Sequence, residues 1–334
     1  MNTYGQAAEY VPVIDLAPFL AGDDNAKHAV AREVARVCES TGFLIVSGHG
    51  IAEQVLEDAF ATSRAFFDQD QAAKDKWHPR GPARQRGYHA LATRGLANTL
   101  DNSVPPDLRE TVFLGPIDDH RAHFAPIPNA ATAYAENIYP DAPAGFSPAL
   151  AALYRAYERL SLDLLRIFAV ALEMPEETFA DKMRRHFSIL SAHHYPPLSA
   201  PPLTGQLRTG AHTDFGAFTI LAMTDAIGGL EALSPRGHWL PVAPRPGALV
   251  VNLGDMMARW TNDRWKSTLH RVVNPGELDA WNSRRQSIGF FAHPDFDARI
   301  DCIPTCLAPG ETPRYPTITA GEHIALKIAK SHAA

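Results

Sequence analysis

His212-Thr213-Asp214 lies between short apolar runs that alternate with polar residues and are punctuated by glycine. Such runs are typical of β-strands, in which residues i and i+2 point to the same side. The two outer side chains of this triplet can therefore reach one metal ion. His270 lies in a later strand-like run, and an antiparallel return would bring it opposite the triplet. Two imidazoles and one carboxylate are the ligand set of non-haem Fe(II) oxygenases.

A second triplet of the same form, His293-Pro294-Asp295, shows that the motif alone is weak. The chain after it contains neither a histidine at a comparable distance nor an Arg-x-Ser sequence. We therefore interpret this triplet as a chance occurrence. We predict that the catalytic metal ligands are His212, Asp214 and His270.

Arg285-Gln286-Ser287 repeats the i, i+2 arrangement in a strand-like run that continues to Phe291. The fork of an arginine is suited to bidentate carboxylate binding, and a serine hydroxyl adds a donor. An arginine that faced a barrel interior without an anion would be costly to bury. The pattern predicts that Arg285 and Ser287 hold a carboxylate beside the metal.

Short antiparallel strands are expected to fill most of residues 186–302, and helix-like spacing occurs at 27–40, 51–68, about 148–174 and from about 321. These features predict a mainly β fold with flanking helices, namely a double-stranded β-helix or jelly-roll core with a helical N-terminal region. Residues 80–110 are expected to be an irregular binding loop or lid. We expect four regions: an N-terminal helical or mixed region (1–125), a connector with a long supporting helix (126–185), a jelly-roll catalytic core (186–302) and a C-terminal extension with a helix (303–334).

Five further motifs give the chain a resemblance to a known family. They lie, in order, at residues 11–16, 42–51, 195–197, 228–231 and 252–255. Together with the metal triad they resemble the isopenicillin N synthase-like family of Fe(II)/2-oxoglutarate-dependent dioxygenases over roughly residues 11–296. A likeness of this extent cannot come from one shared motif.

The resemblance implies an oxidoreductase that uses Fe(II), 2-oxoglutarate and O2 to oxidise, and in the first place hydroxylate, a small organic molecule, with release of succinate and CO2. It implies that Arg285 and Ser287 bind the distal carboxylate of 2-oxoglutarate. It also places Tyr195, His193 and Asn252 on the cofactor side. The chain departs from the family at His193, where asparagine is frequent. The long interval between the last metal ligand and Arg285 predicts an extended hairpin loop that opens at 274–277.

Composition excludes several other classes of protein. The chain has 334 residues, a net charge of -6 and a pI near 6.2, so it lacks the basic character of a nucleic-acid-binding protein. Charged residues interrupt the strongest apolar stretch, residues 160–174, and the N-terminus lacks a secretory pattern. Three cysteines favour a reducing compartment. We expect a cytoplasmic enzyme with a small-molecule substrate, no nucleic-acid or membrane partner, and a monomeric state by default.

The sequence indicates the substrate less clearly than it indicates the reaction. The arginines in or beside the irregular stretch make an acidic small molecule conceivable, but solvated loop arginines are the more common case, because arginine is mostly exposed. The candidates for this pocket are Arg84, Arg86, Arg94, Arg109, Tyr88, Phe215 and Phe291.

Several alternatives remain open at this point. An oxidase of the same fold could cyclise or desaturate its substrate without 2-oxoglutarate, since a substrate carboxylate could occupy the arginine site. An ethylene-forming-like enzyme would fragment 2-oxoglutarate itself. A non-catalytic jelly roll, a structural zinc site and a zinc hydrolase are further alternatives, although structural zinc usually takes four protein ligands.

Overall fold

The computed structural model describes residues 10–81, 85–95, 104–198, 200–226, 228–276 and 283–333. Its core consists of an eight-stranded major sheet, in the order β1-β2-β10-β7-β12-β5-β4-β3, and a four-stranded minor sheet, β6-β11-β8-β9. The major strands are β1 (Val13–Asp15), β2 (Phe43–Ser47), β3 (Gly87–His89), β4 (Glu110–Leu114), β5 (Ile189–Tyr195), β7 (Phe218–Met223), β10 (Leu249–Leu253) and β12 (Arg285–Ala292). The minor strands are β6 (Thr209–His212), β8 (Leu230–Leu233), β9 (Trp239–Pro241) and β11 (His270–Val272).

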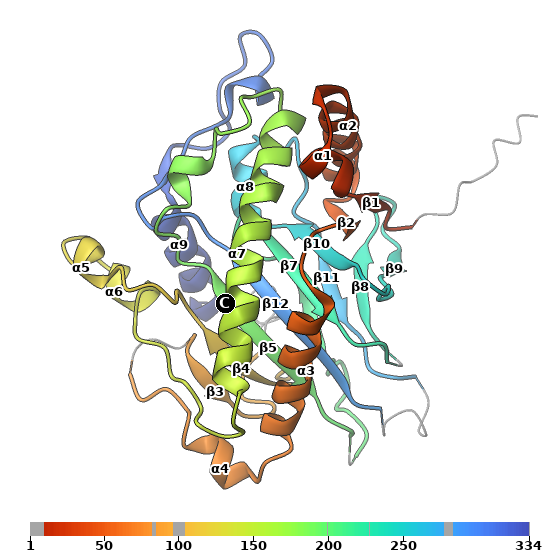
Figure 1. Ribbon diagram of the computed structural model, residues 1–334, viewed down its shortest axis with the longest axis vertical. Helices are drawn as coiled ribbons and strands as arrows, with labels where there is room; N and C mark the ends of the chain where they lie inside the picture. The colour runs from red at the N-terminus through yellow and green to blue at the C-terminus, as the bar shows by residue number, and fades with distance from the viewer. Residues whose placement is uncertain are drawn as a thin grey trace, which may run out of the picture.

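Helices cover the outer face of the major sheet, and helices also lie near both termini of the chain (Figure 1). None of the described helices is long and apolar enough to cross a membrane. They are α1 (Ala17–Ala21), α2 (Asp24–Ser40), α3 (Glu53–Phe67), α4 (Gln71–Asp75), α5 (Arg121–Phe124), α6 (Ala130–Ala133), α7 (Phe146–Ala171), α8 (Asp255–Trp260) and α9 (Ala320–Ala333). Two 3-10 turns (Ala180–Lys182 and Pro304–Cys306) and the small β13–β14 pair (Arg299–Ile300 and Ile318–Thr319) complete the described elements.

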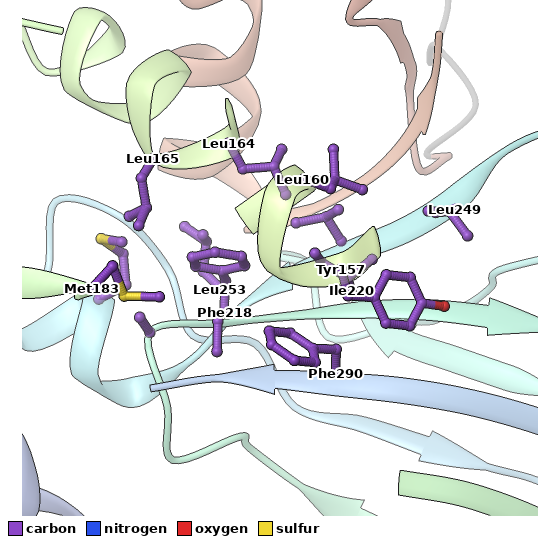
Figure 2. Close-up of a cluster of buried hydrophobic side chains, with 14 of the residues drawn as sticks. Tyr157, Leu160, Leu164, Leu165, Met183, Phe218, Ile220, Leu249, Leu253 and Phe290 are labelled. Atoms are coloured by element: carbon purple, nitrogen blue, oxygen red, sulfur yellow. The ribbon is translucent and has the colours of Figure 1, made fainter. Parts of the chain in front are cut away.

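Helix α7 lies across the outer face of the major sheet, and α2 and α3 lie beside it (Figure 1). Its apolar residues recur every three or four positions, so one stripe of the helix faces the sheet. Figure 2 shows Leu160 and Leu164 of this stripe above Phe218 and Phe290 of the sheet. These four side chains are at most 1% exposed. Burial of each stabilises the fold by roughly 1.5–3 kcal/mol.

Period-two alternation gives the major sheet two different faces. In β12, Phe290 packs on Tyr154 of α7, and the Ile288 carbonyl accepts a hydrogen bond from the Tyr157 hydroxyl. Arg285 and Ser287 alternate with these residues and therefore point to the inner face, toward the minor sheet. A second apolar cluster, which includes Phe43, Tyr195, Val250, Leu230 and Val272, joins the two sheets on that side. The jelly-roll core expected from the sequence is confirmed.

Two expectations need correction. Residues 80–110 are not wholly irregular, because β3 lies within them, and β1 to β4 extend the major sheet beyond the predicted core of 186–302. The connection after His270, the last predicted metal ligand, is not a hairpin. Strand β11 pairs with β6 and β8 in the minor sheet, whereas β12 pairs with β5 and β7 in the major sheet. The chain therefore crosses between sheets there, and residues 277–282 of this crossing lie outside the described part.

Candidate metal centre

Strands β6 and β11 bring the predicted ligands together. They pair antiparallel, with His270 directly opposite His212 and a register shift before Val272. Strand β6 ends at His212, so Asp214 lies just past its end rather than within a longer strand. The antiparallel return expected from the sequence is thus present.

The three side chains surround a common point. Oδ1 of Asp214 lies 3.6 Å from Nε2 of His212 and 3.7 Å from Nε2 of His270. All three groups are buried, and their ligand atoms lie within 4.8 Å of one another. In the described part of the chain, this is the one cluster of histidine, cysteine or acidic groups close enough to hold a metal ion.

Hydrogen bonds set the orientation of both imidazoles. Nδ1 of His212 lies 2.8 Å from the Gly210 carbonyl oxygen, and Nδ1 of His270 lies 3.1 Å from the Thr268 carbonyl oxygen. A carbonyl can only accept, so each Nδ1 carries the proton and each Nε2 presents a lone pair. Burial, as the larger cause, and the neighbouring His270, as the next, lower the pKa of His212 to about 3. Its ring is therefore neutral near pH 7.

The second carboxylate oxygen of Asp214 is held away from the metal position. Its Oδ2 accepts hydrogen bonds from Thr219 Oγ1 at 2.5 Å and from Asn252 Nδ2 at 2.7 Å. Burial by itself raises the pKa of this carboxyl, but the two imidazoles and the two hydrogen bonds outweigh it and lower the pKa. The sequence placed Asn252 on the cofactor side; its amide instead orients the carboxylate ligand. Thr219 was missed, because its contact depends on the packing of β6 against the major sheet.

Arg285 lies on the inner face of the same major sheet. Its side chain is 2% exposed, its guanidinium carbon is 4.9 Å from the centre of the Tyr195 ring, and its Nη1 is 3.5 Å from Ser287 Oγ. Among the described residues, no carboxylate lies within ion-pair distance of it. Burial lowers its pKa, although the guanidinium stays charged near neutral pH. A buried cation of this kind fits an external anion.

Strand β5 places His193 and His194 on opposite faces, as adjacent strand positions require. His193 faces inward, where Nδ1 lies 3.0 Å from Thr111 Oγ1. Burial and then the charges of Arg109 and Arg285 lower its pKa well below the usual value, so the ring is neutral. His194 faces outward and bonds to Glu110 at 2.7 Å.

The predicted substrate residues are distributed over both faces of the sheet. Phe291 shares the inner face with Arg285, and Phe215 is half-buried directly after the metal ligand. Tyr88 faces the outer side, where its hydroxyl donates to Glu110 at 2.5 Å. The prediction that Tyr88 lines the substrate pocket is therefore corrected. On β3, the side chain that points to the inner face is that of His89. The guanidinium of Arg86 is also committed elsewhere, since it donates to the carbonyls of residues 85, 133 and 135. Arg84 lies outside the described residues.

Helix α9 contacts residues 213–215, the segment that carries Asp214, and thereby supports it. Sequence reasoning missed this contact. The Asp255 N–H donates to the Asp214 carbonyl at 2.7 Å, and the Asp255 carboxylate accepts from Thr213 Oγ1 and pairs with Lys327 of α9. His323, also on α9, lies 3.0 Å from the Phe215 carbonyl oxygen. No local pattern relates residues 213–215 to a helix a hundred positions later.

The donor set fits Fe(II) better than structural zinc. Two imidazoles and one carboxylate form the three-ligand set typical of non-haem iron sites with open positions. Structural zinc sites usually have four ligands and often include thiolates. The three cysteines lie elsewhere: Cys38 is buried in the core on α2, and Cys302 and Cys306 follow β13.

Comparisons with known proteins agree with this geometry. Residues 11–142 match the family described as "non-haem dioxygenase in morphine synthesis N-terminal", and residues 186–294 match the 2OG-Fe(II) oxygenase superfamily. The 2-oxoglutarate-Fe(II) type oxidoreductase hxnY of Emericella nidulans is 32% identical, over 94% of this chain and 88% of its own length. The proline hydroxylase buaE of Petromyces alliaceus is 32% identical, over 90% of this chain and 93% of its own length.

Solved structures give the same result. A full-length Neurospora crassa protein in complex with alpha-KG superposes with a TM-score of 0.82 and 28% identity, covering 97% of this chain and 96% of that one. A putative 2OG-Fe(II) oxygenase family protein of Caulobacter crescentus gives a TM-score of 0.80 and 28% identity, covering 97% and 99%. The resemblance inferred from the sequence motifs is confirmed.

Proposed function

The chain belongs to the 2OG-Fe(II) oxygenase superfamily, and we propose that it hydroxylates a carbon atom of a small organic molecule at a metal held by His212, Asp214 and His270. It is an oxidoreductase that uses Fe(II), 2-oxoglutarate and O2. With these bound, the metal centre couples decarboxylation of 2-oxoglutarate to succinate and CO2 with transfer of oxygen to the substrate. The convergence of the three buried ligand atoms carries the proposal.

The protein's own contribution is to hold the ligands in place before the metal binds. The Gly210 and Thr268 carbonyls fix the tautomers of the two imidazoles, and Thr219 and Asn252 leave only Oδ1 of Asp214 free. Groups that are already oriented lose little conformational freedom on binding. Iron held by these three residues would supply the chemistry that joins 2-oxoglutarate and O2.

Arg285 and Ser287 hold the distal carboxylate of 2-oxoglutarate in this proposal. Both lie on the inner face of β12, and the guanidinium packs on the Tyr195 ring. The charge of a buried guanidinium is strong in this low-dielectric setting, and its fork matches a carboxylate in a bidentate manner. Tyr195 supports the guanidinium, while its hydroxyl bonds to Thr209 at 3.3 Å.

The relatives support a small-molecule substrate without identifying it. One relative is named a proline hydroxylase, and the Neurospora crassa protein was also crystallised with alpha-KG and thymine. Proline and thymine differ in size, charge and hydrogen-bonding groups. Residues outside the metal and 2-oxoglutarate sites must therefore select the substrate.

The test is an anaerobic titration of the Fe(II)-loaded protein with 2-oxoglutarate, followed by the visible charge-transfer band of a chelated keto acid. Arg285→Gln should weaken 2-oxoglutarate binding by about tenfold or more, because it removes a charged hydrogen-bonding partner. Arg284→Gln is a matched control. Its side chain points to the opposite face of the strand and pairs with Asp68.

A saturable band that is weakened only in Arg285→Gln supports the assigned roles. Equal affinity for 2-oxoglutarate in both variants would contradict the role of Arg285. Iron binding without any band would favour an oxidase that does not use 2-oxoglutarate. Failure of the protein to bind iron would overturn the metal assignment.

A further inference from the structure

The minor sheet supports the two histidine ligands unequally. His270 lies on β11, which has a partner strand on each side, β6 and β8. His212 lies on β6, which is the edge strand of that sheet and pairs with β11 alone among the described strands. An edge strand leaves a row of N–H and C=O groups without partners in the sheet. Strand β6 therefore needs a second support if His212 is to keep a fixed position.

The pairing of β6 is also irregular beside His212. His270 is opposite His212 and Val272 is opposite Thr209, so β6 has one more residue in this interval than β11 has. The extra residue of such a bulge interrupts the hydrogen bonds of the sheet locally. Gly210 lies in this interval, and its carbonyl oxygen is the group 2.8 Å from Nδ1 of His212. The acceptor that sets the tautomer of His212 thus belongs to the least regular part of the strand.

The segment just before β4 gives this part of the chain contacts that β11 does not supply. The Leu108 N–H donates to the Leu207 carbonyl at 3.0 Å, and Oδ1 of Asp107 accepts the Gly210 N–H at 2.9 Å. Gly210 is buried, so its N–H would be costly to leave without an acceptor. The Asp107 carboxylate thus takes the place that a partner strand would have at this position.

The side chain of Asp107 connects the two sheets. It is 1% exposed, and its second oxygen, Oδ2, pairs with Nη2 of Arg109 at 3.2 Å. Arg109 directly precedes β4 of the major sheet. The two oxygens of a carboxylate accept hydrogen bonds independently, so one bonds to the minor-sheet strand and the other to the major-sheet side. The guanidinium also balances a charge that would otherwise be costly to bury.

We propose that Asp107 is a positioning residue of the metal centre, which holds Gly210 and through it the imidazole of His212. The proposal rests on the metal site assigned above, and Asp107 is not a member of its ligand cluster. Both polar groups of Gly210 are used, the N–H by Asp107 and the C=O by His212, so the backbone on either side cannot turn without breaking a hydrogen bond. Glycine is the residue whose backbone turns most easily. Without Asp107, Gly210 would move more freely, and Nε2 of His212 would be held less firmly toward the metal position.

The experiment titrates the full chain with Co(II), whose visible absorption reports the geometry of its ligands, and measures the affinity by calorimetry. Asp107→Ala should weaken Co(II) binding by about tenfold, the lower end of the range for partners of metal ligands, and alter the absorption of the saturated protein. Two double variants isolate the hydrogen bond to Gly210 in a background without the ion pair. Asp107→Leu with Arg109→Met has no acceptor and should resemble Asp107→Ala. Asp107→Asn with Arg109→Met has the same branched shape and one acceptor, and it should bind within about threefold of the wild type.

Asp295→Ala is the control, because it removes the acceptor of the Arg185 N–H, a comparable contact away from β6, and it should bind Co(II) as the wild type does. The double variants decide the question if Asp107→Ala does not fold, since replacing both members of a buried ion pair by uncharged residues is often tolerated. Equal Co(II) affinity and absorption in the two double variants would overturn the proposal, as would an equal loss of affinity in Asp107→Ala and Asp295→Ala. A wild-type protein that binds no Co(II) would overturn the metal assignment and this proposal together. The titration contains no 2-oxoglutarate, so absence of the charge-transfer band would count against the proposed function and not against the role of Asp107.

Discussion

His212-Thr213-Asp214 and His293-Pro294-Asp295 have the same spacing, and all four of their titratable groups are buried. The first triplet ends a strand whose antiparallel partner supplies His270. The second follows the last residue of β12, where Pro294 cannot continue the ladder of hydrogen bonds. In the described part of the chain, only the first triplet belongs to a cluster that could hold a metal.

The second triplet is used for packing. The ring of His293 stacks on Phe187 with ring centres 5.0 Å apart, and its backbone bonds to Ser188. The carboxylate of Asp295 accepts the Arg185 N–H at 2.6 Å. These contacts connect β12 to the segment before β5.

The two carboxylates respond to burial in opposite ways. Burial raises the pKa of Asp295 to about 6, because one backbone hydrogen bond does not offset it. In Asp214 the two imidazoles and two side-chain donors outweigh the same penalty, so its pKa is lowered. Spacing alone therefore does not make a carboxylate a ligand, because its neighbours decide whether it is charged.

The largest expected effect comes from Asp214→Asn. Thr219 and Asn252 both donate to the outer oxygen, so the new amide must turn its oxygen toward them and its NH2 toward the metal position. An amide NH2 is not a ligand, and we expect loss of Fe(II) binding and of turnover. Asp295→Asn is the matched control and should bind Fe(II) as the wild type does. Equal loss in both variants would contradict the distinction between the triplets.

A smaller effect is expected from the residues that orient Asp214. Asn252→Ala and Thr219→Val should each weaken Fe(II) binding by about 10- to 100-fold, the range found when the partners of metal ligands are removed. Thr224→Val, just beyond the same strand, removes a hydroxyl that bonds only to the Gln286 backbone and is the control. Metal titrations followed by calorimetry measure all three. Unchanged Fe(II) affinity in both test variants would show that Asp214 does not need this support.

Helix α9 braces the first triplet through Lys327 and Asp255. The pair is partly exposed, so Lys327→Ala should weaken Fe(II) affinity only about two- to fivefold. Lys27→Ala, which breaks a similar surface pair with Glu176, should leave the affinity unchanged. An equal change in both variants would indicate a general electrostatic effect and not a brace.

The smallest expected effect is on stability, and it depends on pH. The folded pKa of Asp295, about 6, lies above that of an unfolded aspartate, about 3.9, so the folded state binds the proton more tightly. The stabilising contribution of this group is present below about pH 4 and is lost as pH rises to about 6. Asp295→Asn removes this dependence and keeps an acceptor for the Arg185 N–H. Its melting temperature relative to the wild type should therefore be higher at pH 8 than at pH 4.5; no such difference would contradict the shift.

Much of the site could be predicted because it depends on local spacing. Period-two alternation explains why Arg285 and Ser287 both point inward. It also explains why His193 and His194 point to opposite faces of the sheet. The same rule places Tyr88 and His89 on opposite faces, but it does not say which face is inner. No strand was expected at Tyr88, because residues 80–110 were predicted to be irregular, and Tyr88 was predicted to line the pocket although it faces Glu110 on the outside.

The family, the mainly β fold and the predicted ligand set could all be inferred from the sequence alone, because side-chain chemistry and strand periodicity are properties of short segments. The tertiary structure decided that Thr219 and Asn252 orient Asp214, that β11 and β12 lie in different sheets, and that α9 braces residues 213–215. It also brought the Asp107 carboxylate to the Gly210 N–H. These contacts join residues far apart in the chain, and they arise from how sheets and helices bury their apolar faces against one another.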